Sequence, residues 1–182
     1  MPDSERITAL LIGRVGDVII ATPTLRALRQ RFPRARIRLV LHSQCRGLIP
    51  MIPFCDEFLT LARFPGLFGN MALIKALRQP HSLFIDLNPS FSRTADALTR
   101  LAAADDKLGF DKGPKSALTR RIDAVGEREH MLDRYARLAK ALEAHYEPRT
   151  ELRLTSEDEK QADRILPARP AAGKKRILIH AG

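Results

Sequence analysis

The chain has 182 residues, 45% of them hydrophobic, and carries a formal net charge of +10 at pH 7. This length suits one domain with a well-formed core and is too short for two ordinary domains. No run approaches the roughly 18 consecutive apolar residues of a transmembrane helix, and the N-terminus lacks the pattern of a signal peptide. We therefore expect a cytoplasmic protein.

The basic composition indicates an anionic partner. Arginine supplies most of the positive charge, in groups at 26–38 and 107–121. Nucleic acid, anionic lipid headgroups and phosphorylated small molecules all fit such a surface, and an ordinary solvated surface is the alternative. Nucleic acid is disfavoured because aromatic residues make up only 5% of the chain and tryptophan is absent.

The cysteines and histidines do not form a metal-binding pattern. Cys45 and Cys55 have no Cys-x-x-Cys spacing and no histidine at ligand distance, so we expect two reduced, partly buried thiols. The five histidines are scattered singly. The sequence therefore predicts no metal site.

The N-terminal segment predicts a strand, a glycine loop and a helix. The apolar run 7–12 predicts a buried strand, after which come Gly13, Gly16 and Asp17 and then a helix. Glycine can take positive φ and allows close approach to the backbone. The spacing is neither the dinucleotide fingerprint nor the P-loop. Ligands of open α/β sheets bind outside the carboxyl ends of strands, so we expect Asp17 in a ligand crevice.

Two interpretations of the first helix stay open. Thr22 could be an N-cap followed by Pro23 at the first helical position, or Pro23 could lie within a helix that began near Asp17 and kink it.

The rest of the chain alternates between predicted strands and helices. Strands are expected at 36–42, 56–61, 82–87 and 107–110, and helices at 43–49, 71–78, 93–104, 127–146 and 156–165. Ser90 or Ser92 is expected to cap the helix at 93–104, and Ser156 with Glu159 to form a capping box. A long basic loop is expected at 111–126. This order predicts an α/β fold, a Rossmann-like open parallel sheet with helices on both faces.

The C-terminal part predicts a domain boundary. Residues 1–166 form the predicted domain, 167–176 have linker composition, and 177–182 have the character of a strand. We expect the chain to stop where a second α/β domain would begin.

Several polar residues are candidates for the site. Asp17 could take a proton from an acceptor hydroxyl as a general base, or could stabilise the free amides of the helix N-terminus. Asp86 and Asn88 end a buried strand, where they could face the crevice or cap the turn. Arg14 could bind a phosphate or be an exposed loop side chain. The best candidate patch for an anionic acceptor, against an ordinary solvated loop, is formed by Lys112, Lys115, Arg120 and Arg121.

Taken together, these segments resemble glycosyltransferase family 9, the lipopolysaccharide heptosyltransferases. The segment 12–29 carries Gly-Arg-Val-Gly-Asp-Val and Thr-Pro-Thr-Leu-Arg-Ala-Leu-Arg, which resemble the opening of that family. Weaker agreement follows in order: Phe-Ile-Asp-Leu at 84–87, Lys-Leu-Gly-Phe at 107–110, the segment 130–138, and Ile-Leu-Ile-His-Ala-Gly at 177–182. This last segment is similar to the first strand of the family's second domain.

The resemblance implies one half of a GT-B fold and an inverting, metal-independent transfer without a cofactor, from ADP-heptose to a phosphorylated lipid A core. By this resemblance Asp17 is the base and this domain holds the acceptor. We therefore expect the candidate residues Gly13, Arg14, Gly16, Asp86 and Asn88 on the acceptor side with the basic patch. An acceptor in the inner leaflet implies peripheral attachment to the cytoplasmic membrane. The family's donor-binding domain is missing, so we expect no sugar transfer by this chain alone. No feature indicates an oligomeric state.

Two other classes of function remain as alternatives. One is a stand-alone, flavodoxin-like module that binds phosphate or nucleotide without catalysis. The other is a basic nucleic-acid-binding or scaffold protein, which would bind duplex with a steep salt dependence.

Overall fold

The structure is a computed structural model that describes residues 5–62, 68–123 and 129–165. The chain divides into two compact units, Met1–Leu152 and Arg153–Gly182. The predicted linker at 167–176 and the predicted strand at 177–182 lie outside the described residues.

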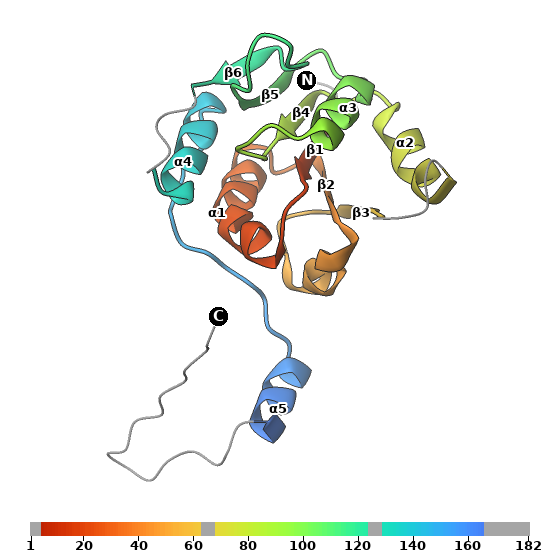
Figure 1. The fold of residues 1–182 in the computed structure, drawn as a ribbon. Coiled ribbons are helices and arrows are strands. Elements are labelled where there is room, and N and C mark those ends of the chain that lie inside the picture. The colour runs from red at the N-terminus through yellow and green to blue at the C-terminus, as the bar shows by residue number, and fades with distance from the viewer. Residues whose placement is uncertain (1–4, 63–67, 124–128, 166–182) are drawn as a thin grey trace. The chain divides into compact units, whose positions relative to one another are not determined.

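The first unit is built on one six-stranded sheet in which all neighbouring strands are parallel (Figure 1). The strands are β1 (Arg6–Leu11), β2 (Arg36–His42), β3 (Glu57–Leu61), β4 (Leu83–Asp86), β5 (Lys107–Phe110) and β6 (Arg120–Ile122). Their order in the sheet is β3-β2-β1-β4-β5-β6. The predicted open parallel sheet is therefore confirmed. Its order reverses between β1 and β4, as in dinucleotide-binding folds, and differs from the flavodoxin order.

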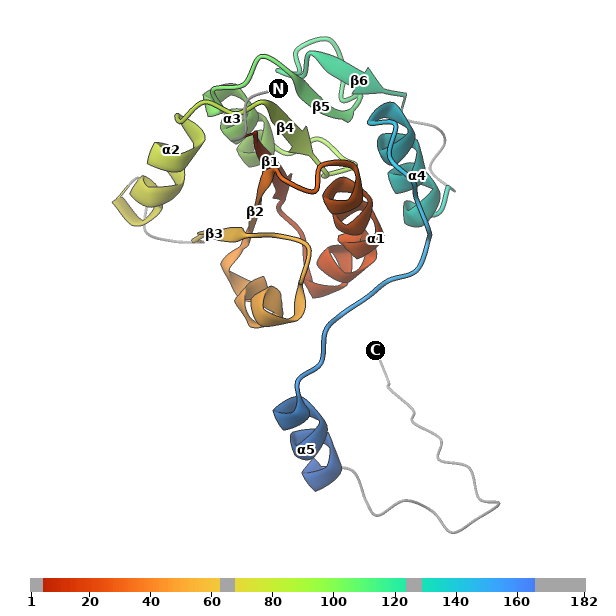
Figure 2. The same cartoon turned by 180° about the vertical axis from the view of Figure 1, so that it is seen from behind.

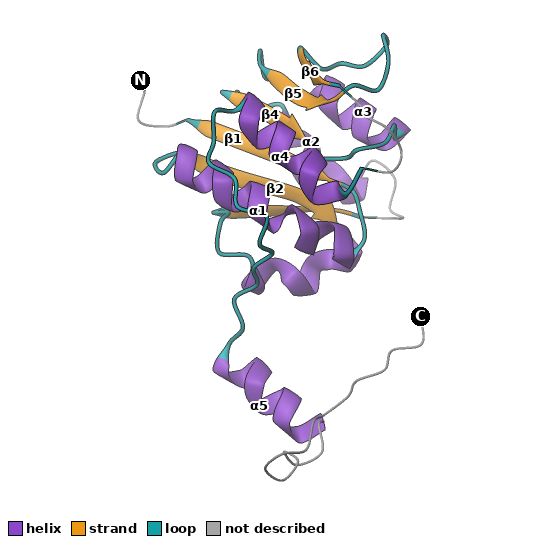
Figure 3. Cartoon of the chain, turned by 90° about the vertical axis from the view of Figure 1, so that its left-hand side faces the viewer, coloured by secondary structure: helices purple, strands orange, loops and turns teal. Residues whose placement is uncertain are grey.

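Helices cover both faces of this sheet (Figures 2 and 3). On one face, α1 (Val15–Arg31) and α4 (Met131–Ala141) pack Leu25 and Leu138 into the larger apolar core. On the other, α2 (Met71–Leu77) and α3 (Arg93–Leu101) contribute Leu73 and Leu98 to a second core. Because both faces are covered, the central strands are almost continuously buried.

Short 3₁₀ segments follow two of the strands. They are η1 (Ser43–Met51), where a short helix was predicted, and η2 (Phe68–Asn70), which leads into α2. In the part of the chain that is described, no helix is long and apolar enough to cross a membrane. Cys45 is buried, Cys55 is half-buried, and neither forms a disulfide.

Helix α1 already begins at Val15, so Pro23 lies inside it and Thr22 is not its N-cap. Proline has no N–H for the carbonyl of Ile19, four residues earlier. The hydroxyl of Thr22 donates to that carbonyl instead, at 2.7 Å. The same hydroxyl accepts a hydrogen bond from the backbone N–H of Glu151 at 3.0 Å. The helix therefore begins near Asp17 and contains Pro23, which is the second of the two interpretations of the sequence.

The predicted loop at 111–126 is wrong in one part, because Arg120–Ile122 forms β6 and pairs with β5. This strand has only three residues, two of them arginines, and it lies at the edge of the sheet. Short, charged strands are common at sheet edges, where they discourage further pairing, and they carry no apolar signal in the sequence.

The predicted helix at 127–146 is shorter in the structure. It begins at Met131, after His130, whose ring Nδ1 accepts a hydrogen bond from Leu132 N at 3.2 Å. It ends at Ala141, and the chain then turns through Glu143, which has a φ of 53°. Residues 124–128 lie outside the described residues.

Two caps can be compared with their predictions. Ser92, one of the two predicted residues, caps α3 by accepting from Ala95 N. In the second unit, α5 (Ser156–Ile165) is capped one residue earlier than predicted. Thr155 Oγ1 accepts from Asp158 N, and Asp158 Oδ2 accepts from Thr155 N at 2.8 Å, so the predicted box of Ser156 and Glu159 is wrong by one position.

Candidate functional site

A pocket of about 230 Å³ lies where the order of the sheet reverses. Its walls come from the end of β1, the first turn of α1, the loop between β4 and α3, and α4. Ligands of open α/β sheets bind at this reversal point, outside the carboxyl ends of the strands. Pockets that enclose a drug-sized molecule measure about 300 to 1,000 Å³, so this one fits part of a larger ligand.

Asp17 lines this pocket with an exposed side chain in the first turn of α1. Its Oδ2 accepts a hydrogen bond from the backbone N–H of Arg14 at 2.7 Å. Within the described residues, Oδ1 makes no hydrogen bond. One oxygen therefore caps the helix while the other is left for a ligand, so the capping and chemical roles do not exclude each other.

Gly13 is required by the position of the Asp17 side chain. A Cβ added at Gly13 would lie 2.6 Å from Asp17 Oδ2 and 2.7 Å from Asp17 Cβ. Gly16 is different, because a Cβ there would meet nothing within 4 Å. Neither glycine uses positive φ; among the described glycines only Gly113 does, at 94°. The loop thus needs glycine for the close approach of a side chain.

Asp86 and Asn88 join the strand ends behind the pocket. Asn88 Oδ1 accepts from Ile12 N at 2.8 Å, and Asn88 Nδ2 donates to Asp86 Oδ1 at 2.7 Å and to Leu10 O. Both residues are buried, at 2% exposure for Asp86 and 5% for Asn88. Asn88 also lines the pocket, whereas Asp86 does not, so the two residues link β1 to β4 beneath its wall.

Lys112 completes this network from the loop after β5. Its Nζ lies 2.5 Å from Asp86 Oδ2, and the two side chains are only 4% and 3% exposed. A buried charge must be paired and hydrogen-bonded to be tolerated, and here each partner neutralises the other.

The structure does not bring the four residues of the predicted basic patch together. Arg120 begins β6 at the amino end of the sheet, where it pairs with Asp106 at 2.9 Å and donates to Ala141 O. Arg121 donates to Ser116 O and lies 3.9 Å from Asp111 Oδ1. Lys115 is exposed and Lys112 is buried against Asp86. Most of these charges are therefore used in contacts within the chain.

Arg14 directly follows Gly13, which lines the pocket. It is exposed, and its guanidinium makes no hydrogen bond or ion pair with any described residue. The N-terminus of α1 and this side chain together make the loop attractive to a negative group.

Several pocket residues were not singled out from the sequence. Phe91 is 59% exposed at the pocket wall, between Ser90 and Ser92. A phenylalanine between two serines in a polar loop is the available signal for it. Tyr135 is 1% exposed, and its hydroxyl donates to Leu87 O at 3.3 Å. Burial raises the pKa of Tyr135, so the hydroxyl stays a donor.

The described residues contain no group of three or more metal-ligating side chains that could hold a metal ion. Cys45 is near the loop, where its thiol donates to Gly13 O at 3.5 Å. Burial, and then the charge of Asp17, raise the pKa of this thiol. Cys45 is therefore a packing residue at the loop rather than a reactive thiolate.

No protein-family model and no curated protein sequence matches the chain. Solved structures do match it. A glycosyltransferase family 9 structure from Veillonella parvula is 19% identical over 90% of this chain and 50% of that chain, with a TM-score of 0.70. The E. coli heptosyltransferase WaaC with ADP is 19% identical over 80% of this chain and 50% of that chain, with a TM-score of 0.63.

A third structure, E. coli ADP-heptose lps heptosyltransferase II, is 18% identical over 88% of this chain and 50% of that chain, with a TM-score of 0.64. The chain therefore spans about half the length of the structures it matches. Identity at this level establishes a common fold. The chain has the Rossmann-like fold of one half of a GT-B protein, which it shares with the Veillonella parvula structure and the two E. coli heptosyltransferases.

Proposed function

We propose that this chain is the acceptor-binding half of an inverting glycosyltransferase. The reaction in this proposal transfers heptose, or a related sugar, from ADP-heptose to a phosphorylated lipid A core, without a metal ion. The observation that carries it is the position of Asp17, with one free carboxylate oxygen at a pocket on the reversal point of a glycosyltransferase-like fold.

The proposed chemistry needs one base on this side. Asp17 Oδ1 accepts the proton of an acceptor hydroxyl as that oxygen attacks the anomeric carbon from the face opposite the nucleotide. The new bond forms to the acceptor oxygen, the bond from the anomeric carbon to the phosphate oxygen breaks, and ADP leaves with the electron pair. Gly13 leaves room for the Asp17 side chain and Arg14 N donates to its Oδ2, while the side chain of Arg14 is available to an acceptor phosphate.

The base is tested by replacing Asp17 with asparagine in the whole protein that contains this sequence. We expect Asp17→Asn to lower kcat for ADP release by about 100-fold or more, because general-base catalysis contributes roughly 10²- to 10⁴-fold. The acceptor KM should change little, since the asparagine keeps the shape. Asp105→Asn, which alters an exposed carboxylate outside the pocket, is the matched control. Full activity of Asp17→Asn would remove Asp17 from the mechanism.

Acceptor binding is tested on the 182-residue chain by titration with a soluble, deacylated and phosphorylated lipid A core. Saturable binding that weakens in Arg14→Ala supports the proposal. Binding of ADP alone, with no affinity for the acceptor, would favour the nucleotide-binding module instead.

A further inference from the structure

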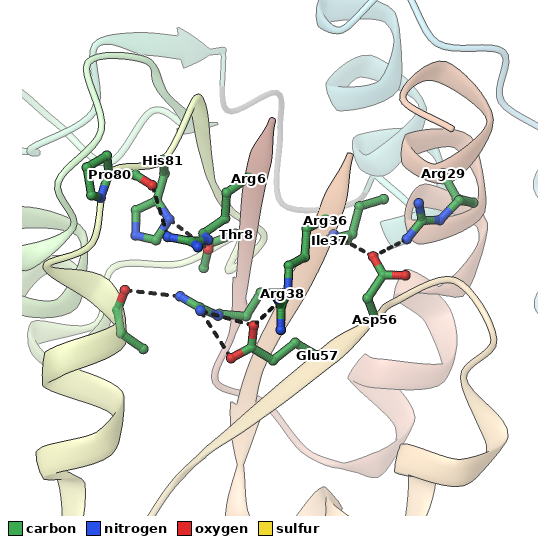
Figure 4. A network of polar contacts seen from close by, with 11 residues as sticks. Arg6, Thr8, Arg29, Arg36, Ile37, Arg38, Asp56, Glu57, Pro80 and His81 are labelled. Atoms are coloured by element: carbon green, nitrogen blue, oxygen red, sulfur yellow. Dashed lines mark hydrogen bonds and ion pairs between the residues drawn. The ribbon is translucent and has the colours of Figure 1, made fainter. Parts of the chain in front are cut away.

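A second, strongly basic pocket lies on the α2 face of the sheet, at the amino ends of β1, β2 and β3. It measures about 390 Å³, and four of its lining side chains are cationic: Arg6, Arg36, Arg38 and Lys75. Its only carboxylate is that of Glu57. Figure 4 shows the three arginines and Glu57 gathered at this face.

The register of the strands produces this cluster. Arg6 of β1 is the partner of Arg36 in β2, and Arg38 is the partner of Glu57 in β3. Because alternate residues of a strand face the same side, Arg36 and Arg38 both point to this face. Arginines at the start of neighbouring parallel strands therefore lie side by side at one corner of the sheet.

The single carboxylate does not neutralise these cations. Both oxygens of Glu57 accept from Arg38 Nη2 at 3.0 Å, and Arg36 Nε lies 3.5 Å from Glu57 Oε2. Arg6 donates only to the carbonyl of Pro80, at 3.4 Å, and the exposed Lys75 has no partner among the described residues. Two cations thus share one acid and two have none.

Arg38 is a buried part of this pocket with a fixed position, unlike the mobile charged side chains of an ordinary surface. It is only 3% exposed, and besides Glu57 it donates to the carbonyl of Ala76 in α2 at 3.0 Å. Its Nε is buried and has no hydrogen-bond partner within the described residues. A fixed, buried guanidinium keeps its charge and strengthens the positive field of the pocket, since screening is weak there.

His81 lies close to the same arginines. Burial lowers the pKa of His81, and the charges of Arg38 and Arg6 lower it further, against the opposing hydrogen bond to Leu77 O. Positive potential therefore extends along this corner of the sheet.

We propose that the pocket of Arg6, Arg36, Arg38 and Lys75 binds an anion that carries a phosphate group with two or more negative charges. Arginine forks suit phosphate oxygens, and the volume exceeds that of a single phosphate, which leaves room for a diphosphate or a phosphate ester. The site is separate from the Asp17 pocket. Arg6 begins β1 and Gly13 follows its end, a span of roughly 20 Å at about 3.3 Å per residue.

The first experiment titrates inorganic pyrophosphate into the 182-residue chain by calorimetry. We expect saturable binding that weakens at least about tenfold in Arg36→Ala/Lys75→Ala, two exposed side chains whose loss leaves Arg38 and Glu57 paired. The matched control is Arg78→Ala/Lys140→Ala, which removes the same charge from exposed positions outside the pocket. Binding that is absent, or that weakens equally in both variants, would overturn the proposal.

The second experiment locates the ligand and identifies its source. Lysine acylation is followed by mass spectrometry with and without pyrophosphate, and Lys75 should be protected while Lys140 is not. Vesicles that contain phosphatidic acid are then compared with neutral vesicles. Protection of Lys75 by pyrophosphate alone indicates a soluble phosphate compound, and protection by the acidic vesicles indicates a lipid headgroup. Equal labelling of Lys75 under all conditions would overturn the site.

Discussion

At the scale of single residues, the two glycines of the first loop have different roles. A Cβ at Gly13 would collide with Asp17 Oδ2 at 2.6 Å and with its Cβ at 2.7 Å, so the whole side chain must move. We expect Gly13→Ala to break the bond from Arg14 N and to lower the free energy of unfolding by about 1 kcal/mol, the worth of a helix cap. Acceptor affinity should fall as well.

Gly16→Ala is the control for this prediction. It adds a methyl group where nothing lies within 4 Å, inside a helix in which alanine is favoured over glycine by about 1 kcal/mol. Urea denaturation should therefore show unchanged or greater stability. Equal losses in both variants would show that the contact with Asp17 is not what requires Gly13.

The ion pair of Lys112 and Asp86 is the second residue-scale test. Lys112→Met leaves a carboxylate buried without its cation, and we expect a loss of about 3 to 5 kcal/mol in the free energy of unfolding. The double variant Asp86→Asn/Lys112→Met should recover part of this loss, because no unpaired charge remains. Additive losses in a double-mutant cycle would contradict the pairing.

Only some residues of the candidate site could be predicted from the sequence. Asp17 and Asn88 could be placed from strand ends, because parallel strands bring their carboxyl ends to one edge. The pairing of Lys112 with Asp86 could not be predicted, because it depends on how the loop after β5 folds back over β4. For the same reason, nearness in sequence suggested a patch of four cations that the fold separates.

At the scale of elements, α1 shows how one side chain can keep a proline inside a helix. Thr22 replaces the missing hydrogen bond at Ile19 O and accepts from Glu151 N, which ties the segment after α4 to α1. We expect Thr22→Val to lower the free energy of unfolding by about 1 to 3 kcal/mol, since it leaves two partly buried backbone groups unpaired. Thr22→Ser keeps the hydroxyl and should retain most of the stability. Thermal unfolding of the two variants checks this.

Elements with a strong apolar pattern were predicted well. The strand at 36–42 and the strand at 107–110 have their predicted bounds, because the apolar residues of both are buried and polar residues mark their limits: Arg36 and His42 in one, Lys107 and the following Asp111 in the other. β6 was missed since an edge strand of three residues needs no apolar run. The C-terminal end of α4 was missed because its last predicted turn is replaced by the turn at Glu143, whose φ is positive.

At the scale of the whole molecule, the net charge of +10 did not identify the partner surface. Many arginines are paired with carboxylates, as Arg26 is with Glu151 and Arg29 with Asp56. Among the described residues, the side chain of Arg14 has no carboxylate partner, and positive charge is in excess at the corner of Arg6 and Arg36. Which cations are available to an anionic partner therefore depends on which of them lack a carboxylate, and composition alone does not show this.

The stability of the whole domain should depend on pH through His81. This histidine is 7% exposed, with Nδ1 3.2 Å from Thr8 Oγ1 and Nε2 3.1 Å from Leu77 O. Burial, together with the charges of Arg38, Arg6 and Lys107, lowers its pKa below the ordinary value of 6.5. The folded protein therefore takes up this proton at a lower pH than the unfolded chain does.

The sign of the effect follows from this difference. The stability that His81 contributes is fully present above pH 6.5. It is lost as the pH falls below that value, because the unfolded state then binds more protons than the folded state. Urea denaturation at pH 7.5 and 5.0 should show a larger loss for the wild type than for His81→Gln, whose amide can still bond to Leu77 O and does not titrate. The other histidines are present in both proteins and cancel in the comparison. Equal losses would mean that His81 is not the group responsible.

A further loss of stability near pH 3.8 and below should persist in His81→Gln, because it belongs to Asp56. There burial opposes ionisation, but hydrogen bonds from Ile37 N and Arg29 hold the pKa below 3.8.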